Sequence, residues 1–374
     1  MTITVRTKSL RRALTIARKA TARKPTLAVL KTVQMRLVDG KLEITGTNLD
    51  LGARITISDV EVSGDFNPVC IDPTVVLSSL KGAGRYTKLG NFQNATDVDE
   101  FPGIRFDGFV ARHAMNNIDL SVISNHFATA TINHHQRASL RGVYLEEDGN
   151  DLIVTATDGF RLHHTTRPGV VRDGKMSLLV PGEFWALANA AFSNHPDIIE
   201  GGLKEVYEDD PYSYGLWGCG QDSDGLEIMV IGMLIHGKFP DYRPIMPTSY
   251  RFLTAVNVAD LERELVIGAS LKDSGSTSLI SVLKFEGETL HLTCIGGNFR
   301  DAPRYETTVS VRPLEMRGNG WFAVNTRFLL DAIKLDAIKQ YAGEVAIQWS
   351  SEREPIVFQV GRVKKIVMPV RFYE

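Results

Sequence analysis

The stretch VQMRLVDGKLEITGTN, residues 33–48, decides the fold of this chain because it has the pattern of a β-hairpin. Apolar and polar residues alternate on both sides of Asp39-Gly40, and this acid-Gly pair is typical of a tight turn because glycine adopts positive φ without steric cost. The second half ends in threonine followed by small and polar residues. The pattern therefore predicts two antiparallel strands joined by a short turn.

The same pattern occurs twice more, as GVYLEEDGNDLIVTATDG (142–159) and SVLKFEGETLHLTCIGG (281–297). Each copy follows a helix-like stretch, and the three expected helices cover residues 7–22, about 117–131, and 259–272. Each copy also precedes a strand-then-helix unit: FNPVCIDPTVVLSSL (66–80), MSLLVPGEFWALANAAF (176–192) and GWFAVNTRFLLDAI (320–333). Periods above 100 residues exceed those of stacked repeats, so the sequence predicts repeated domains.

Hairpins that alternate with single helices predict an α+β fold, with the helices grouped on one side of antiparallel sheets. Proline punctuates the chain near residue 105 and in FPDYRPIMP (239–247). We therefore expect three similar domains with the boundaries 1–104, 105–246 and 247–374.

The composition is that of an ordinary globular protein, with 374 residues, of which 43% are hydrophobic and 23% charged. We expect no membrane segment and no signal peptide, because no apolar run approaches the roughly 20 residues that a membrane helix needs. Cys70, Cys219 and Cys294 form neither a CxxC pair nor an even disulfide framework. A reducing cytoplasm is the simplest location for such a chain.

Basic residues are concentrated at the N-terminus, although the formal net charge is −2. Residues 2–24 contain eight basic residues and no acidic one: Arg6, Lys8, Arg11, Arg12, Arg18, Lys19, Arg23 and Lys24. At about 100° per residue, Lys8, Arg12, Lys19 and Arg23 share one helix face, and Leu10, Ala13, Leu14 and Ala17 share the other. The cationic face fits a merely solvated surface or a polyanion, and the absence of acids favours the polyanion.

Enzyme motifs are missing from the sequence. It contains no GxxxxGK[ST] loop, no HExxH and no GxSxG, and GAGRYTK (82–88) lacks the lysine spacing of a phosphate loop. The pairs His134-His135 and His163-His164 place adjacent side chains on opposite strand faces, so we expect no metal site, no cofactor and no catalytic residues. A DNA-modifying enzyme stays the alternative interpretation. A nuclease site needs carboxylates that converge in space to bind metal ions, and a sequence does not show which carboxylates do so.

Five segments resemble signature segments of the bacterial DNA polymerase III beta subunit, the beta sliding clamp family. They are RKPTLAVL (23–30), GTNLDL (46–51), TATDGFRL (155–162), KFPDYRPIMP (238–247) and VMPVRF (367–372). They occur in the order and at the approximate spacing of that family, so the chain resembles a divergent member of it.

The resemblance implies a non-catalytic, head-to-tail homodimeric ring that encircles double-stranded DNA and confers processivity on a replicative polymerase. Phosphate contacts would hold DNA without stopping on any sequence. The implied DNA-binding residues are Arg12, Lys19, Arg23, Lys24, His134 and Arg137.

The resemblance also implies a hydrophobic pocket for short linear peptides of the polymerase, the clamp loader and repair proteins. The residues at the matching positions are Leu140, Thr157, Gly159, Phe160, Arg161, Leu162, Pro240, Ile245, Ile366, Met368, Pro369, Val370, Arg371 and Phe372. An apolar cleft with an adaptable methionine suits leucine and aromatic anchors of varied partners. Taken without the resemblance, the same residues fit the packing of an interdomain seam.

Several positions depart from the family pattern. Phe160 stands where histidine is common, Pro244 stands where a basic residue is usual, and Tyr373-Glu374 extend the tail, so we expect an altered peptide preference. Four positions hold residues other than those of the family that commonly contact DNA or are basic: Ala138, Ser139, Gly182 and Glu183. We therefore expect weaker attraction to DNA at these four positions.

The first domain is shorter than the family pattern by about one hairpin between VVLSSLKGAG (75–84) and EFPGI (100–104). In the family, that region supplies an edge strand to the dimer contact. Here the contact would have to be supplied by residues 86–100 alone, YTKLGNFQNATDVDE. The opposite dimer surface would include Ser270, Leu271 and Lys272, and we expect a looser or differently closed dimer.

Overall fold

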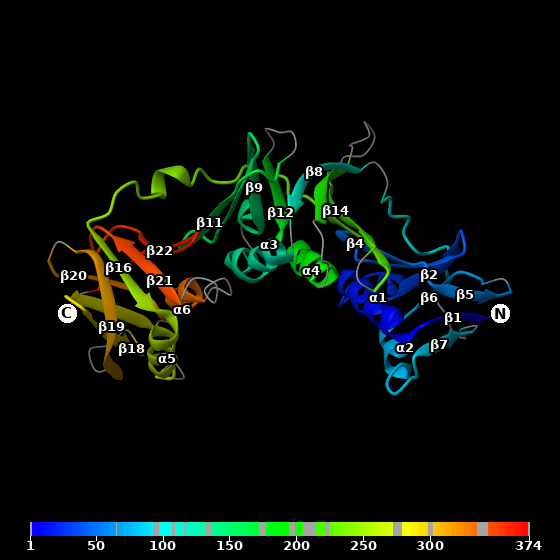
Figure 1. The fold of residues 1–374 in the computed structure, drawn as a ribbon, viewed down its shortest axis with the longest axis horizontal. Helices are drawn as coiled ribbons and strands as arrows, with labels where there is room; N and C mark the ends of the chain where they lie inside the picture. The colour runs from blue at the N-terminus through cyan, green and yellow to red at the C-terminus, as the bar shows by residue number, and fades with distance from the viewer. Residues whose placement is uncertain are drawn as a thin grey trace. The chain divides into compact units, whose positions relative to one another are not determined.

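The computed structural model describes residues 2–64, 66–90, 92, 97–106, 109–115, 117–131, 137–171, 177–193, 199–204, 214–221, 224–271, 279–297, 302–316, 318–334 and 343–372 (Figure 1). The chain divides into two compact units. Unit 1 comprises residues 1–128, 145–152 and 168–236, and unit 2 comprises residues 129–144, 153–167 and 237–374. No helix in the described part of the chain is long and apolar enough to cross a membrane.

The order strand, helix, three strands, strand and helix occurs three times along the chain, with one additional strand before the second helix of the first copy. The first copy contains β1 (Thr2–Arg6), α1 (Thr7–Ala20), β2 (Val33–Val38), β3 (Lys41–Thr47), β4 (Leu51–Ile57), β5 (Val60–Ser63), β6 (Val69–Ile71), α2 (Pro73–Ser79) and β7 (Tyr86–Leu89). The second contains β8 (Phe109–Met115), α3 (Asn117–Val122), β9 (Gly142–Asp148), β10 (Asp151–Thr157), β11 (Arg161–Arg167), β12 (Ser177–Pro181), α4 (Gly182–Phe192), β13 (Ile199–Lys204), β14 (Tyr214–Gln221) and β15 (Leu226–Met233).

The third copy contains β16 (Phe252–Asn257), α5 (Val258–Ala269), β17 (Ile280–Glu286), β18 (Thr289–Ile295), β19 (Arg304–Met316), β20 (Gly320–Asn325), α6 (Thr326–Ile333), β21 (Glu344–Trp349), β22 (Ile356–Val360) and β23 (Val363–Val367). Short 3₁₀ turns lie at Ala28–Lys31, Ala128–Ala130, Ala138–Leu140 and Arg243–Ile245. The expected α+β fold with antiparallel sheets is therefore confirmed.

The three hairpins form where the repeated pattern predicts them. β2 pairs with β3, β9 lies beside β10, and β17 pairs with β18. The turn glycines Gly40, Gly149 and Gly287 have φ of 75°, 59° and 57°. This left-handed conformation is the one that glycine adopts without a Cβ clash, which is the physical reason for the acid-Gly pattern.

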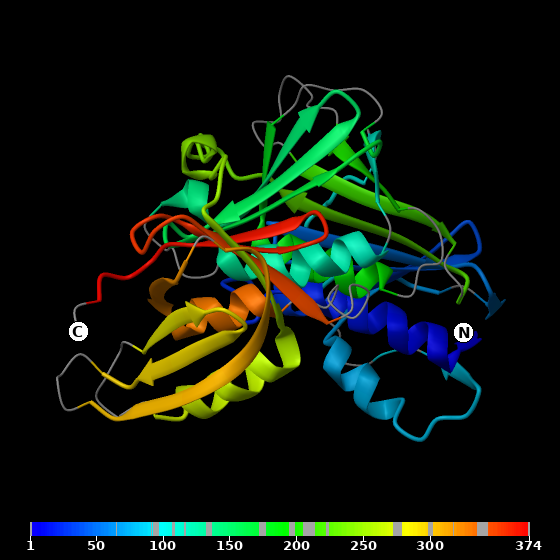
Figure 2. The same ribbon diagram turned by 60° about the vertical axis from the view of Figure 1, so that its left-hand side comes forward.

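The expected helices also form, with shifted ends. α1 ends at Ala20 rather than residue 22, and α5 covers Val258–Ala269 rather than 259–272. The middle helix was expected at 117–131, but α3 ends at Val122 and continues as a π-helical turn at Ile123–Phe127. In each copy the two helices pack on each other: α1 on α2, α3 on α4, and α5 on α6 (Figure 2).

The apolar face of α1 is fully buried, as its periodicity predicts. Leu10, Ala13, Leu14 and Ala17 have no exposed surface, and α1 packs on β3 and β4. Gly46 on β3 permits this close approach, because a Cβ there would collide with the carbonyl oxygen of Ala17. In unit 2 the indole of Trp349 forms the centre of the core, with Phe285 and Phe322 ring centroids 4.5 and 5.3 Å away.

Continuous sheets run from one copy into the next. In unit 1, an eight-stranded sheet has the order β6-β2-β3-β4-β15-β14-β13-β8, and β4 of the first copy pairs with β15 of the second. In unit 2, β11 of the second copy pairs antiparallel with β23 of the third. The first copy also has a separate sheet with the order β5-β1-β7. The domain boundaries at residues 104 and 246 stay predictions.

Candidate functional site

The segment TATDGFRL forms the tight turn between β10 and β11, and Asp158 organises it. One carboxylate oxygen of Asp158 accepts hydrogen bonds from the backbone N–H groups of Phe160 and Arg161, both at 2.9 Å. Thr157 donates its hydroxyl to the carbonyl of Arg161 at 2.6 Å and accepts from the N–H of Gly159, whose φ is 85°. The turn directs Phe160 into solvent, where 59% of it is exposed.

The corresponding turn of the first copy, between β3 and β4, has the same hydrogen bonds. Thr47 donates to the carbonyl of Leu51 at 2.7 Å, and Asn48 accepts from the N–H of Leu51 at 2.7 Å. Leu49 occupies the place of Gly159 with φ of 80°. The sequences TNLDL and TDGFR therefore build one turn twice, which supports the internal repeat at atomic detail.

Arg161 is buried behind this turn and is held by carboxylates on both sides. Its guanidinium lies 2.9 Å from Asp158 and 2.7 Å from Asp331 of α6, and it donates to the carbonyl of Thr129 at 3.0 Å. The guanidinium carbon also lies 5.0 Å from the ring centroid of Phe328. Because Arg161 is only 8% exposed, it acts as an internal brace between β11 and α6 rather than as a free cation.

His163 and Lys365 extend the charged cluster on β11 and β23. His163 lies 3.2 Å from the same Asp331 oxygen, and the fully buried Lys365 donates to the carbonyls of Asp331 and Lys334 at the end of α6. Burial lowers the pKa of His163, and Lys365 lowers it further, against the opposing effect of Asp331. Burial raises the pKa of Asp331, but His163, Lys365 and Arg161 together hold it well below its usual range.

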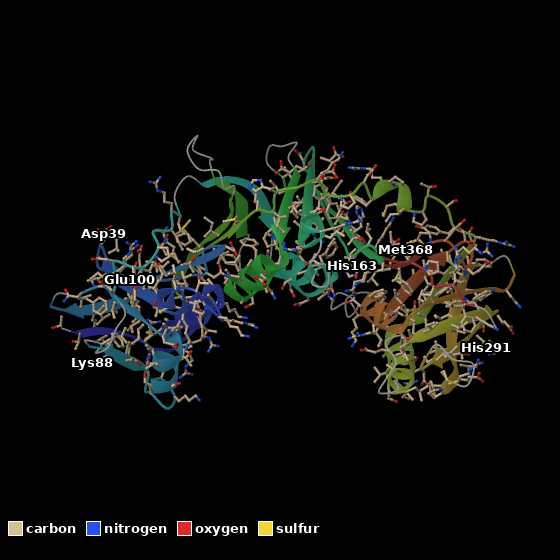
Figure 3. The ribbon with its side chains drawn as sticks, turned by 180° about the vertical axis from the view of Figure 1, so that it is seen from behind. Asp39, Lys88, Glu100, His163, His291 and Met368 are labelled. Atoms are coloured by element: carbon tan, nitrogen blue, oxygen red, sulfur yellow. The ribbon has the colours of Figure 1, made fainter. Side chains whose placement is uncertain are left out.

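The C-terminal tail runs from this cluster across the third copy. The N–H of Met368 donates to the carbonyl of Phe160 at 2.9 Å, and the N–H of Val370 donates to the carbonyl of Ala323 at 2.8 Å. Val370 and Phe372 pack against the buried cluster of Val282, Ile295 and Ala323. Figure 3 labels His163 and Met368, which lie on β11 and just beyond β23, the two strands that pair in this part of unit 2.

The segment FPDYRPI is anchored by its aromatic residues. The rings of Phe239 and Tyr144 stack at 4.7 Å between centroids, and Tyr242 lies 5.7 Å from His164. Pro240 is exposed beside these anchors, and 40% of Ile245 is exposed. The segment is therefore fixed on the strands β9 and β11, which lead into the turn that carries Phe160.

The predicted peptide-binding residues divide into supports and accessible groups. Leu140, Thr157, Arg161, Leu162 and Ile366 are buried supports. The exposed or half-buried members are Gly159, Phe160, Pro240, Ile245, Met368, Pro369, Val370, Arg371 and Phe372. Tyr373 and Glu374 lie outside the described residues.

Sequence reasoning missed two residues of α6 that belong to this region. Phe328 stacks with Phe160 at 6.2 Å between centroids, and Asp331 binds Arg161 and His163. Their spacing of three residues places them on one face of α6, and the strand-helix unit GWFAVNTRFLLDAI was the available signal. Nothing in the sequence indicated that this face meets the TDGFRL turn.

A second candidate region is a cationic hollow in unit 1, with a volume of about 840 Å³. Its lining includes the predicted Lys19, Arg23 and Lys24, together with Arg18 and Lys31, which were not predicted. Asp72 and Glu183 are its acidic members. Burial raises the pKa of Asp72, but hydrogen bonds from Thr74 and the nearby Lys31 lower it below its usual value, so Asp72 stays charged and offsets part of the positive potential.

Two further predicted DNA contacts, Arg12 and Arg137, are not among the residues that line this hollow. Arg12 donates to the carbonyl of Ala191 at 3.1 Å and lies 3.8 Å from Asp224, with only 13% of its side chain exposed. Arg12 therefore packs on α4, and its contact with DNA stays a prediction. Arg137 is exposed in unit 2, and His134 lies outside the described residues.

The predicted dimer residues Ser270 and Leu271 follow α5, and Lys272 lies outside the described residues. Val266 and Ile267 on α5 expose 52% and 44% of their surfaces. Within the described part of the chain, no three His, Cys, Asp or Glu residues converge in a way that could hold a metal ion.

Comparisons with known proteins agree on one fold. No family model matches the chain. A curated beta sliding clamp of Staphylococcus epidermidis is 21% identical over 95% of each chain, and one of Salmonella typhimurium is 23% identical over 60% of this chain and 62% of its own. The crystal structure of the DNA polymerase III beta subunit of Thermotoga maritima superposes with a TM-score of 0.83 at 20% identity, with both chains fully covered.

The fold is that of a beta sliding clamp. The sliding clamp of Bacillus subtilis superposes equally well, with a TM-score of 0.82 at 15% identity over the whole of both chains. The resemblance inferred from five short segments is therefore confirmed, and the low identities fit a divergent beta clamp.

Proposed function

We propose that this chain is a non-catalytic DNA sliding clamp that forms a homodimeric ring around double-stranded DNA and makes a replicative polymerase processive. The single observation that carries the proposal is the full-length match to sliding clamp folds. Two local features of the described residues support it: an aromatic and aliphatic surface in unit 2, and a cationic hollow in unit 1. Such a clamp would act in the cytoplasm, without cofactor, metal or small-molecule substrate.

The surface in unit 2 suits a short linear peptide of a polymerase or clamp loader. The exposed Phe160 stacks with the half-buried Phe328, and the N–H of the half-buried Met368 donates to the carbonyl of Phe160. Pro369 and Val370, which follow Met368, are also half-buried. Buried ion pairs fix the turn, α6 and β23, so the surface is ordered before a partner arrives. Ordering the site in advance lowers the entropic cost of binding an apolar anchor.

The replacement of the common histidine by Phe160 changes the chemistry offered to a peptide. A second aromatic ring beside Phe328 enlarges the apolar surface, and no imidazole is present at this position to donate a hydrogen bond. We therefore propose that partners of this clamp carry leucine or aromatic anchors rather than polar groups at the position facing Phe160.

The cationic hollow suits the phosphate backbone of duplex DNA. Arg18, Lys19, Arg23, Lys24 and Lys31 bring five positive charges to one concave surface, against Asp72 and Glu183. Phosphate attraction does not depend on base sequence, which is what a sliding contact requires. We propose Lys19, Arg23 and Lys24 as phosphate contacts, and Arg18 and Lys31 as additional ones.

The proposal is tested by primer extension on a long single-stranded template with a cognate polymerase and clamp loader. We expect longer products when the chain and the loader are both present, and no change when either is omitted. A nuclease assay with Mg²⁺ on the same template is the control for the alternative enzyme interpretation. Unchanged product length in the complete mixture would contradict the proposal.

A further inference from the structure

The junction between the first and second copies, in unit 1, repeats backbone contacts of the proposed peptide surface in unit 2. In unit 2, the N–H of Met368 donates to the carbonyl of Phe160 at 2.9 Å. In unit 1, the N–H of Met233 donates to the carbonyl of Asp50 at 2.8 Å. The β3–β4 and β10–β11 turns also share their internal hydrogen bonds, so Asp50 stands at the place of Phe160 and Met233 at the place of Met368.

The segments that follow the two methionines repeat as well. The N–H of Val370 donates to the carbonyl of Ala323 on β20, and the N–H of Ile235 donates to the carbonyl of Leu179 on β12, both at 2.8 Å. β4 pairs antiparallel with β15 in the same way as β11 pairs with β23. Unit 1 therefore contains a second copy of the backbone framework on which the proposed peptide surface of unit 2 is built.

The side chains on the two frameworks differ where the turn meets the helix of the next copy. In unit 2, the buried Arg161 binds Asp331, the sixth residue of α6. In unit 1, the matching residues are Leu51 of the turn and Leu187, the sixth residue of α4. Both leucines line the cationic hollow of about 840 Å³, so unit 1 has an open space where unit 2 has an ion pair.

The floor of this hollow is apolar. The hollow lies where α1 packs on both α2 and α4, three helices that Figure 1 labels. Its buried lining residues are Leu51, Pro73 and Leu187, and the small residues Ala22 and Ala186 lie at more accessible positions. An aliphatic side chain gains free energy by covering such a surface, whereas a phosphate group does not.

The rim of the hollow is cationic. Its exposed basic residues are Arg18, Lys19, Arg23 and Lys24. Lys31 lies 3.4 Å from Asp72, and Glu183 is the other acidic residue of the lining. The excess of positive charge makes the hollow complementary to a ligand that carries carboxylates beside its apolar group.

We propose that this hollow binds an acidic linear peptide with an aliphatic anchor. The anchor covers Leu51 and Leu187, and the acidic residues that flank it pair with the cations of the rim. The site is additional to the peptide surface of unit 2, so it goes beyond the proposed function. The rim cations are shared with the proposed phosphate contacts, whereas the aliphatic floor serves the peptide alone.

Fluorescence polarisation with the full-length chain tests the proposal. The probe is a fluorescein-labelled peptide with two adjacent leucines flanked on each side by aspartates. We expect saturable binding that Ala186→Glu and Arg18→Glu each weaken by about tenfold or more, because both place a carboxylate at the hollow. Matched controls are Ala83→Glu and Lys41→Glu, at exposed positions of unit 1 outside the lining, and both should keep the affinity of the unmodified chain.

A second probe, in which serines replace the two leucines, separates the peptide from a phosphate contact. It should bind about tenfold more weakly or less, because serine cannot cover the aliphatic floor. Equal affinity of the two probes would overturn the proposal and leave the hollow as a contact for DNA phosphates and other polyanions. Absence of saturable binding of the leucine probe would also overturn it, as would an Ala186→Glu variant that behaves like Ala83→Glu.

Binding of a clamp-binding peptide to unit 2 keeps this result apart from the proposed function. Ala186 lies in unit 1, so Ala186→Glu should leave the affinity for the clamp-binding peptide unchanged, which also shows that unit 2 of the variant is folded. A chain that binds the clamp-binding peptide but not the acidic probe contradicts the second site alone. A chain that binds the acidic probe but does not lengthen primer-extension products contradicts only the proposed function.

Discussion

Asp331 holds the buried charges behind the proposed peptide surface together, because its carboxylate contacts Arg161 at 2.7 Å and His163 at 3.2 Å. Arg161 is 8% exposed and cannot recover solvent contact when this partner is lost. Removing Asp331 leaves Asp158, at 2.9 Å, as the remaining carboxylate partner of Arg161, and loss of a partner from a buried charge is strongly destabilising.

We expect Asp331→Asn to lower the free energy of unfolding by about 3 kcal/mol, because it leaves the Arg161 charge without this carboxylate. Urea denaturation followed by circular dichroism measures the change. The matched control is Asp260→Asn, which removes an exposed ion pair with Arg263 at 3.1 Å and should cost less than about 1 kcal/mol. Equal losses in both variants would show that the cluster does not stabilise unit 2.

His163 gives the same cluster a pH dependence with a definite sign. Its pKa is lowered from 6.5, chiefly by burial, so below pH 6.5 the unfolded chain takes up a proton that the folded chain resists. Stability should therefore fall as the pH decreases from 6.5, by up to about 1.4 kcal/mol per pH unit, until the lowered pKa is reached. Asp331 contributes in a separate window, since its lowered pKa means that its stabilisation is lost only below pH 3.8.

Urea midpoints of the unmodified chain and of His163→Gln between pH 7.5 and 5 measure this effect. We expect a flatter profile for His163→Gln, because glutamine keeps an N–H donor but does not titrate. His291→Gln is the control, since 47% of the His291 side chain is exposed, and its profile should follow that of the unmodified chain. A His163→Gln profile as steep as that of the unmodified chain would contradict the account.

At the scale of elements, the proposed peptide surface depends on three segments that are far apart in sequence: the β10–β11 turn, α6 and the tail after β23. The turn presents Phe160, α6 supplies Phe328, and the tail carries Met368. The three segments meet at the turn, because the rings of Phe160 and Phe328 stack and the N–H of Met368 donates to the carbonyl of Phe160. The thioether of Met368 is the group that adapts to varied anchors.

Phe160→Ala combined with Met368→Ala should weaken binding of a clamp-binding peptide at least tenfold, because both accessible apolar groups are removed. Fluorescence polarisation with a labelled peptide measures the affinity. Leu49→Ala is the control, since Leu49 is 49% exposed on the equivalent turn of the first copy. Binding that survives the double variant but falls in the control would place the peptide site elsewhere.

Local elements were predictable where one physical rule acts alone. The acid-Gly turns and the apolar face of α1 follow from positive φ and from helical periodicity, and both form as expected. The middle helix was predicted too long, because the sequence does not show that the backbone changes to π and 3₁₀ turns after Val122. Phe328 and Asp331 were missed because their roles arise from contacts with a segment about 170 residues away.

At the scale of the whole molecule, the basic N-terminal segment shows what the number and spacing of charged residues in a sequence can predict and what they cannot. Counting predicted a cationic helix face, but Arg12 and Lys8 face Asp224, and the positive charges gather instead at the end of α1 and the residues after it. The pairing of Arg12 with a residue of the second copy depends on the sheet that joins β4 to β15, which no local pattern reveals.

Replacing Lys19, Arg23 and Lys24 together by alanine should weaken association with duplex DNA and reduce its salt dependence. Each lost phosphate contact lowers the slope of log K against log salt by about 0.9, so three contacts lower it by about 2.7. Fluorescence anisotropy over a salt series measures both quantities. A triple variant at Lys41, Lys238 and Arg362 removes the same charge from other exposed positions and should keep the slope; equal slopes for the two triple variants would refute the role of the hollow.

Retention on closed DNA tests the central claim most directly, because a ring holds DNA by topology rather than by affinity. The chain is loaded onto a nicked circular plasmid by a cognate loader, isolated by gel filtration, and then treated with a single-cutting restriction enzyme. We predict that the chain stays with the circle through gel filtration at moderate salt and leaves within minutes of linearisation. Dissociation at the same rate from circular and linear DNA would contradict the sliding clamp account.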